Sequence, residues 1–160
     1  MRLGLLLLLS LLTTAPGVSA AELNIVRVWP SYRTAESFVR IAEYFGGAEN
    51  SDRRIVLRSQ PGERAGYYFL VRIANSGAAR TGCTWQLQVI MPTARTPRAF
   101  TFPAELATGE RVFELGLSGT DWPDARTEPV AWLLVLKTAD GQELARQQSF
   151  LWERPPTPKS

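Results

Sequence analysis

Two pairs of nearby carboxylates are the clearest candidates for chemistry in this sequence: Asp121 with Asp124, and Glu49 with Asp52. Two carboxylates can divide acid and base roles when they are held at a defined separation and have different pKa values. Neither spacing requires such a site, because the solubility of a turn or loop explains both pairs. A hydrolase that uses loop carboxylates is therefore a hypothesis, and not the favoured one.

Other catalytic chemistry has little support in the sequence. Asp121, Asp124 and Glu128 could offer oxygen ligands to calcium, but they lack the alternating acids of a calcium-binding loop. The chain has no histidine, which removes the commonest general base and nearly every zinc or copper site. It contains neither a glycine-rich phosphate loop nor a Gly-x-Ser-x-Gly nucleophile elbow. We therefore expect no enzymatic activity, no metal and no cofactor.

Aromatic side chains in polar surroundings are candidates for binding. Trp122 precedes Pro123 in a polar loop, and Trp29 and Tyr32 lie on either side of Pro30. Tryptophan and tyrosine outside a core often anchor a protein partner or stack on a sugar ring. The same side chains could instead cover the end of a folded core, so both interpretations stay open.

A group of arginines is the second candidate for binding: Arg53, Arg54, Arg58 and Arg64. Guanidinium groups recognise carboxylates, including those of acidic glycans, through paired hydrogen bonds. Alternatively, the charges protect a strand edge from pairing with another chain. The residues that we expect to contact a ligand or partner are Trp122, Trp29, Tyr32, Arg53 and Arg54.

The N-terminus has the pattern of a secretory signal peptide, residues 1–20. A positive start precedes an apolar run from Leu3 to Leu12, and Val18-Ser19-Ala20 provides small residues for cleavage after Ala20. A run of this length is too short for a bilayer, which needs about 20 apolar residues. We expect a secreted or periplasmic protein without a membrane span after cleavage.

The rest of the chain is predicted to form one domain, residues 21–153, followed by a disordered proline-rich tail, 154–160. The formal net charge of the whole chain is only +3, which gives nucleic-acid binding little support. Cys83 is the only cysteine, so no disulfide can form within the chain. It could be a small buried residue or a thiol that pairs between chains, and the sequence does not decide between them.

The domain begins with a segment, 21–60, that includes one predicted short α-helix at about 34–45. Its apolar face would consist of Ala35, Phe38, Ile41, Ala42 and Phe45. Thr34 can cap the start of this helix, and Gly46-Gly47 ends it. Strands are predicted at 23–28, 55–58, 67–74, 84–91, 98–102, 111–117 and in the hairpin 130–152, with proline ending the first and fifth of them or placing the first at a sheet edge.

The hairpin is the clearest element. A type I turn with a bulge and Gly141 in the left-handed region would place Lys137 opposite Glu143 and Leu136 opposite Leu144. A tight type I′ turn would instead place Val135 opposite Arg146. Because both faces of its first strand are apolar, another element must cover Ala131, Leu133 and Val135, and we expect the helix to do so.

Strands at this spacing without intervening helices predict a mainly β, antiparallel sandwich of about seven strands. The strand region, 67–152, resembles an immunoglobulin-like or fibronectin type III-like sandwich of secreted bacterial proteins. The resemblance lies in YYFLVRIANSG, TWQLQVIMP, GERVFELGL and AWLLVLKTADGQEL, and the paired cysteines of antibody domains are missing. Such domains serve in adhesion, spacing, ligand binding or support of enzymes, so the resemblance implies little about function.

We therefore expect an exported, non-catalytic interaction or structural module of the bacterial envelope or exterior. Its partner would be another envelope protein or a glycan. A carbohydrate-binding module that uses exposed aromatic residues is the alternative, and the hydrolase is the second alternative.

Overall fold

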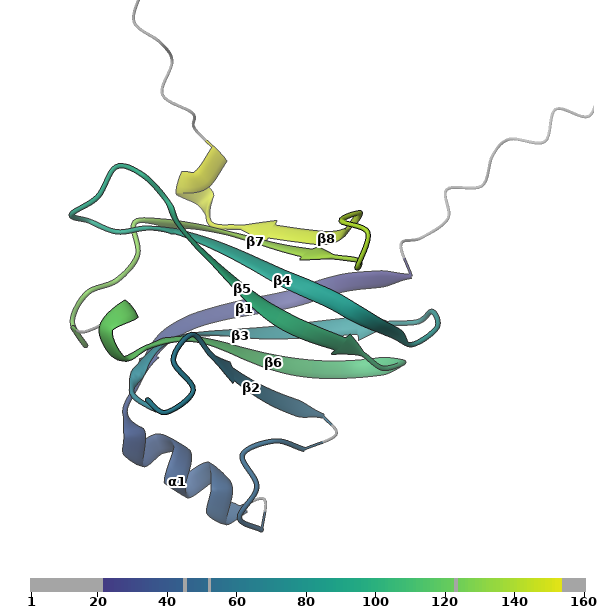
Figure 1. Cartoon of the computed structure of the whole chain (residues 1–160), viewed down its shortest axis with the longest axis horizontal. Helices are drawn as coiled ribbons and strands as arrows, with labels where there is room; N and C mark the ends of the chain where they lie inside the picture. The colour runs from purple at the N-terminus through teal and green to yellow at the C-terminus, as the bar shows by residue number, and fades with distance from the viewer. Residues whose placement is uncertain (1–21, 45, 52, 123, 154–160) are drawn as a thin grey trace, which may run out of the picture.

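A computed structural model describes residues 22–44, 46–51, 53–122 and 124–153 of the chain. The predicted signal peptide, residues 1–20, and the predicted tail, 154–160, lie outside these ranges. The described part is mainly β, with two four-stranded sheets that pack face to face and one short α-helix beneath them (Figure 1). This confirms a mainly β, two-sheet protein with one short N-terminal helix.

Sheet A contains four strands in the order β1-β3-β6-β2. Their bounds are β1 Leu23–Arg33, β3 Gly66–Asn75, β6 Gly109–Ser118 and β2 Arg54–Arg58. β1 pairs with β3 and β3 pairs with β6 in antiparallel register, whereas β2 pairs with β6 in parallel. The expectation of a wholly antiparallel sandwich was therefore wrong for this one strand.

Sheet B contains the remaining strands in the order β5-β4-β7-β8, all antiparallel. Their bounds are β5 Arg98–Leu106, β4 Arg80–Ile90, β7 Ala131–Lys137 and β8 Glu143–Gln148. A short 3₁₀ turn, Gly119–Asp121, follows β6 of sheet A, and another, Phe150–Glu153, follows β8. β1 and β5 continue past Pro30 and Pro103, where shorter strands were predicted. Both are edge strands, so each proline can leave its missing N–H on the unpaired side.

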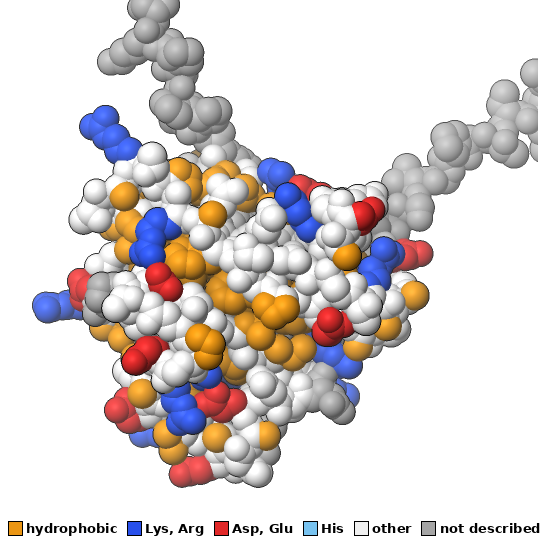
Figure 2. Space-filling view, in the orientation of Figure 1, with side chains coloured by type: hydrophobic (Ala, Val, Ile, Leu, Met, Phe, Trp, Pro, Cys, Tyr) orange, Lys and Arg blue, Asp and Glu red, His pale blue; other side chains and the backbone are white. Residues whose placement is uncertain are grey.

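The core lies between the sheets and takes alternate residues from each strand. Apolar side chains that are fully or almost fully buried include Phe69, Trp85, Leu87, Phe113, Leu115, Trp132 and Leu134. Hydrophobic side chains gather at the centre of the face in Figure 2, and most charged groups lie around it. Trp132 contacts Phe69 edge to face, with ring centroids 5.7 Å apart.

The closing hairpin has the predicted turn but not the whole predicted register. Gly141 has a φ of 88°, its amide donates to the Thr138 carbonyl, and Lys137 pairs with Glu143. A register shift follows at once, so Leu136 pairs with Ala145 and not with Leu144. As a result Val135 lies opposite Arg146, the pairing expected from a tight turn, although the turn itself is the bulged form.

The helix α1, Ala35–Tyr44, forms as predicted, but it covers a different surface. Its buried residue Phe38 packs against Val56, Tyr68 and Leu70 on the outer face of sheet A (Figure 1). Only Thr34 separates α1 from β1, so the short connection holds the helix beside sheet A. Phe45 and the side chain of Ile41, also assigned to the apolar face, lie outside the described residues.

The outer side of β7 is buried without the helix. Leu133 lies between Gln88 and Gln148 in the sheet register, and Val135 lies between Gln86 and Arg146. Directly paired residues share a face of the sheet, so these long side chains flank and shield the apolar ones. Leu133 and Val135 are consequently buried, although the expectation that the helix covers them was wrong.

Candidate functional site

The outer face of sheet A brings together most of the polar residues with unusual surroundings. β6 alternates, with Phe113, Leu115 and Leu117 in the core. Its other residues face outward, in register with the neighbouring strands: Gly116 with Tyr68, Glu114 with Leu70, and Val112 with Arg72. Trp29 of β1 continues the row of Leu70 and Glu114. The helix covers one half of this face and leaves the other half open.

In the covered half, an aromatic pair joins the helix to the sheet. Phe38 is fully buried, with its ring centroid 4.8 Å from that of Tyr68. The guanidinium carbons of Arg33 and Arg58 lie 5.1 and 4.8 Å from the centroid of the Phe38 ring. Tyr68 rests on Gly116, where a Cβ atom would come within 2.3 Å of its ring. Only a glycine at position 116 leaves space for the Tyr68 ring, and that ring is the surface on which Phe38 of the helix packs.

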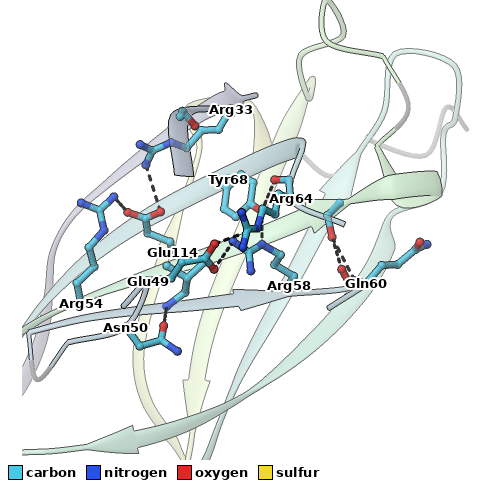
Figure 3. A network of polar contacts seen from close by, with 12 residues as sticks. Arg33, Glu49, Asn50, Arg54, Arg58, Gln60, Arg64, Tyr68 and Glu114 are labelled. Carbon is cyan, nitrogen blue, oxygen red and sulfur yellow. Dashed lines mark hydrogen bonds and ion pairs between the residues drawn. The ribbon is translucent and has the colours of Figure 1, made fainter. Parts of the chain in front are cut away.

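A buried carboxylate lies beside this aromatic pair. The side chain of Glu114 is fully buried, and its Oε2 accepts a hydrogen bond of 3.1 Å from Nη1 of Arg33. Its Oε1 forms an ion pair with Nη2 of Arg54 (Figure 3). Both arginine side chains are largely buried, and burial lowers the pKa of each. One buried negative charge thus has two largely buried positive partners.

A second carboxylate, Glu49, neutralises the next two arginines. Its oxygens lie 2.8 Å from Nη2 of Arg58 and 3.1 Å from Nε of Arg64. Nε of Arg58 also donates to the Tyr68 hydroxyl, which donates to the Arg64 carbonyl (Figure 3). Burial raises the pKa of Tyr68, whereas the bonds from Glu49 and Tyr68 outweigh burial and raise the pKa of Arg58. Three of the four arginines singled out in the sequence therefore have internal carboxylate partners.

The uncovered half of this face forms a pocket of about 770 Å³, which we call the outer pocket. Its lining residues come from the loop before β2 and from all four strands of sheet A: Trp29, Ser51, Arg53, Arg54, Leu70, Arg72, Glu110 and Val112. Three of the five predicted contact residues, Trp29, Arg53 and Arg54, meet here from two distant segments. Trp29 is 39% exposed.

The charges of the outer pocket differ in how well they are neutralised. Arg54 is neutralised by its ion pair with buried Glu114. Arg72 pairs with Glu110 at 2.7 Å, but both side chains are largely exposed, and such pairs contribute at most about 1 kcal/mol. Within the described residues, exposed Arg53 has no ion pair. Arg27 adds a further positive charge 4.7 Å above the Trp29 ring. The pocket is therefore positively charged, and Arg53 and Arg72 are available to a ligand.

The other two predicted contact residues lie elsewhere. Trp122, expected to be exposed, is only 2% exposed; it stacks on Tyr67 at 4.6 Å and donates from Nε1 to the Thr127 carbonyl. The Trp122 ring is therefore buried against the sandwich, so the core interpretation is correct. Tyr32 is half-buried and packs against the main core.

Two of the candidate catalytic carboxylates, Asp121 and Asp124, form ion pairs or hydrogen bonds with other residues of the chain. Asp121 pairs with Arg98 at 2.7 Å. Asp124 accepts hydrogen bonds from the Arg126 amide and the Thr127 hydroxyl, which lower its pKa. Asp52 lies outside the described residues. Among the residues that are described, no three acidic or cysteine side chains are placed to hold a metal ion.

Cys83 is buried in the core beside strand β5, and burial raises the pKa of its thiol. Both features favour the unreactive, small hydrophobic residue over a thiol that pairs between chains.

Sequence reasoning missed three important residues of this face: Glu114, Arg72 and Leu70. Glu114 and Arg72 each interrupt an otherwise apolar strand, at Val112–Leu117 and Leu70–Ala74. A charged residue at the centre of a strand was the signal available. Its partners could not be identified, because they lie on strands whose pairing the sequence does not reveal.

Comparison of the chain with protein-family models and with curated proteins finds no match to either. No helix in the described ranges has the length and apolar character needed to cross a membrane. The geometry of the outer pocket is therefore what bears on function.

Proposed function

We propose that this protein is an exported, non-catalytic interaction module of the bacterial envelope or exterior, and that it binds another envelope protein through the outer pocket. The observation that carries the proposal is the convergence of Trp29, Arg53 and Arg72 on an open, solvent-facing surface. Export rests on the signal pattern at residues 1–20, with cleavage after Ala20.

We further propose that the domain is immunoglobulin-like, with β2 and α1 as additions. Without β2, the strands in chain order take the places A, B, C, C′, E, F and G. Sheet A then has the order A-B-E and sheet B the order C′-C-F-G, which is how such sandwiches divide their strands. Both additions lie at sheet A: β2 is its edge strand beside β6, and α1 packs on part of its outer face.

A binding role suits the chemistry of the outer pocket better than a catalytic one. Among the described residues, its polar groups are arginines, a serine and one exposed glutamate that is already paired. Arginine remains protonated, so it can hold an anion but cannot take up or release a proton as a catalyst does. The described loop carboxylates of the hydrolase hypothesis, Asp121, Asp124 and Glu49, bind their own neighbours and do not line this pocket.

The carbohydrate alternative depends on exposed aromatic residues. Of the two tryptophans predicted as contacts, Trp29 is exposed and Trp122 is buried. Arg27 already stacks on the Trp29 ring. The remaining pocket floor, Leu70 and Val112, is aliphatic and offers few groups to hydrogen-bond a sugar. We therefore favour a protein partner.

Affinity capture from an envelope extract tests the proposal. The mature protein should retain a reproducible partner, identified by mass spectrometry, and Trp29→Ala should lose it. Phe150→Ala is the matched control, because Phe150 is an exposed aromatic residue that follows β8 of the other sheet. Equal capture by the wild type and Trp29→Ala would show that the outer pocket is not the site, and turnover of a substrate would contradict a non-catalytic role.

A further inference from the structure

We infer that the outer pocket takes an acidic, apolar segment of a protein partner: a carboxylate that pairs with Arg53 and Arg72, next to a large apolar side chain that lies against Trp29 and Leu70. This inference deepens the proposed function and rests on it.

The charges of the pocket select an anion. Arg53, Arg54 and Arg72 line it, and among the described residues Glu110 is the only acidic side chain in its lining. Arg54 is held by Glu114 beneath the surface, which leaves Arg53 and Arg72 to meet a ligand. The Arg72–Glu110 pair is exposed and weak, so an incoming carboxylate can share or replace Glu110 at little cost. A cationic segment would face unneutralised arginines.

The floor of the pocket selects an apolar group beside the anion. Leu70 and Val112 lie on adjacent strands, two register positions apart on the same face, and Trp29 pairs with Leu70 on the next strand. Together they form an apolar strip across three strands, bordered by the aliphatic stems of the arginines. A bare anion would leave this strip in water, whereas a neighbouring leucine or aromatic side chain would cover it.

The openness of the pocket selects a segment of a macromolecule over a free small molecule. Sites for small molecules usually bury most of the ligand surface within walls. Here Trp29, Arg53, Arg72 and Glu110 all remain substantially exposed. The volume of about 770 Å³ would hold a few side chains that protrude from a larger partner.

Selection from a random heptapeptide library displayed on phage tests this inference. The mature protein should enrich peptides in which an aspartate or glutamate adjoins a large apolar residue. A fluorescein-labelled winner should then bind with an affinity that falls about tenfold or more for Arg53→Ala or Arg72→Ala, as expected for loss of one charge-assisted contact. Arg146→Ala removes the same charge from the other sheet and should change the affinity less than twofold.

Changes in the peptide supply the matching controls. Replacing its acids by glutamine or asparagine should weaken binding at least tenfold, and replacing its apolar residue by serine should do the same. Glu110→Gln should leave the affinity unchanged or improve it, because that change removes the competing carboxylate.

Other outcomes would overturn the inference. These are enrichment of basic or purely apolar peptides, no enrichment at all, or equal binding by Arg53→Ala, Arg72→Ala and wild type. Binding of an acidic polysaccharide such as polygalacturonate, without binding of acidic peptides, would assign the pocket to a glycan. If the envelope partner is still captured in a Trp29-dependent manner while these peptide tests fail, the proposed function survives and only the acidic, apolar motif is wrong.

Discussion

Replacement of the buried glutamate of sheet A by its neutral isostere, Glu114→Gln, should be strongly destabilising. The Glu114 side chain is 0% exposed, whereas those of its partners Arg33 and Arg54 are 19% and 23% exposed. The substitution preserves size and leaves two largely buried arginines without their counter-charge. Removing one member of a buried ion pair costs about 3–5 kcal/mol. The arginines retain some access to water, so we expect the lower end, about 3 kcal/mol.

Glu110→Gln provides the control for this change. Glu110 lies on the same strand and face, four residues earlier. It pairs with Arg72, and the side chains of Glu110 and Arg72 are 60% and 43% exposed. The chemical change is identical, but an exposed pair contributes only about 0–1 kcal/mol.

Unfolding in urea at pH 7, followed by tryptophan fluorescence, would give the two free energies of unfolding. The difference between the variants should be at least about 2 kcal/mol, most of it lost from Glu114→Gln. If the two variants unfold at the same urea concentration with equal slopes, Glu114 does not hold the arginines as the structure indicates. A difference that disappears in 1 M salt would place Glu114 at the surface, because salt screens exposed pairs far more than buried ones.

Three further changes examine the core, the helix and one tyrosine. Trp132→Ala should lower the free energy of unfolding by about 3–5 kcal/mol, and an unchanged thermal melt would refute its place in the core. Phe38→Ala should raise amide hydrogen exchange in α1 far more than in the central strand β4, because Phe38 is the described residue that joins the helix to the sheet; equal increases in both would show that the helix and sandwich unfold together. Burial, with a smaller contribution from the charge of Glu128, raises the pKa of Tyr67 to about 12. Since the unfolded chain loses this proton near pH 10, the free energy of unfolding should fall between pH 10 and 12, by up to about 1.4 kcal/mol per pH unit. Tyr67→Phe should remove that part of the slope between pH 10 and 12, and an unaltered slope would contradict the assignment.

Features set by neighbouring residues in the chain could be predicted from the sequence. The helix at Ala35–Tyr44 has an apolar face and a glycine stop, and the hairpin turn has Gly141 where a left-handed residue is needed. Features set by pairing between distant segments could not. The register shift beyond Lys137 depends on how β8 fits the sheet, and the parallel placement of β2 beside β6 depends on the path of the chain around α1.

The same division applies to the candidate site. Trp29, Arg53 and Arg54 could be selected because aromatic and guanidinium groups have recognisable binding chemistry. Trp122 has that chemistry too, but its loop folds over Tyr67 and buries it, and composition alone does not distinguish the two cases. Glu114 matters only through its two partners, which lie 81 residues earlier for Arg33 and on another strand for Arg54.

Arg54 belongs to both halves of the outer face, and this links stability to binding. It lines the outer pocket while its guanidinium is held by Glu114. Glu114→Gln should therefore act in opposite directions: it weakens the fold and releases one more positive charge toward the pocket. If the pocket binds an acidic peptide, Glu114→Gln at a temperature where it remains folded should bind that peptide at least as tightly as the wild type. Glu114→Gln combined with Arg54→Met removes both charges, so it should lose any gain in affinity and recover part of the stability, as apolar replacements of buried ion pairs do. Weaker binding by the well-folded single variant would mean that Glu114 shapes the pocket itself, and that the two halves of the face are not separable.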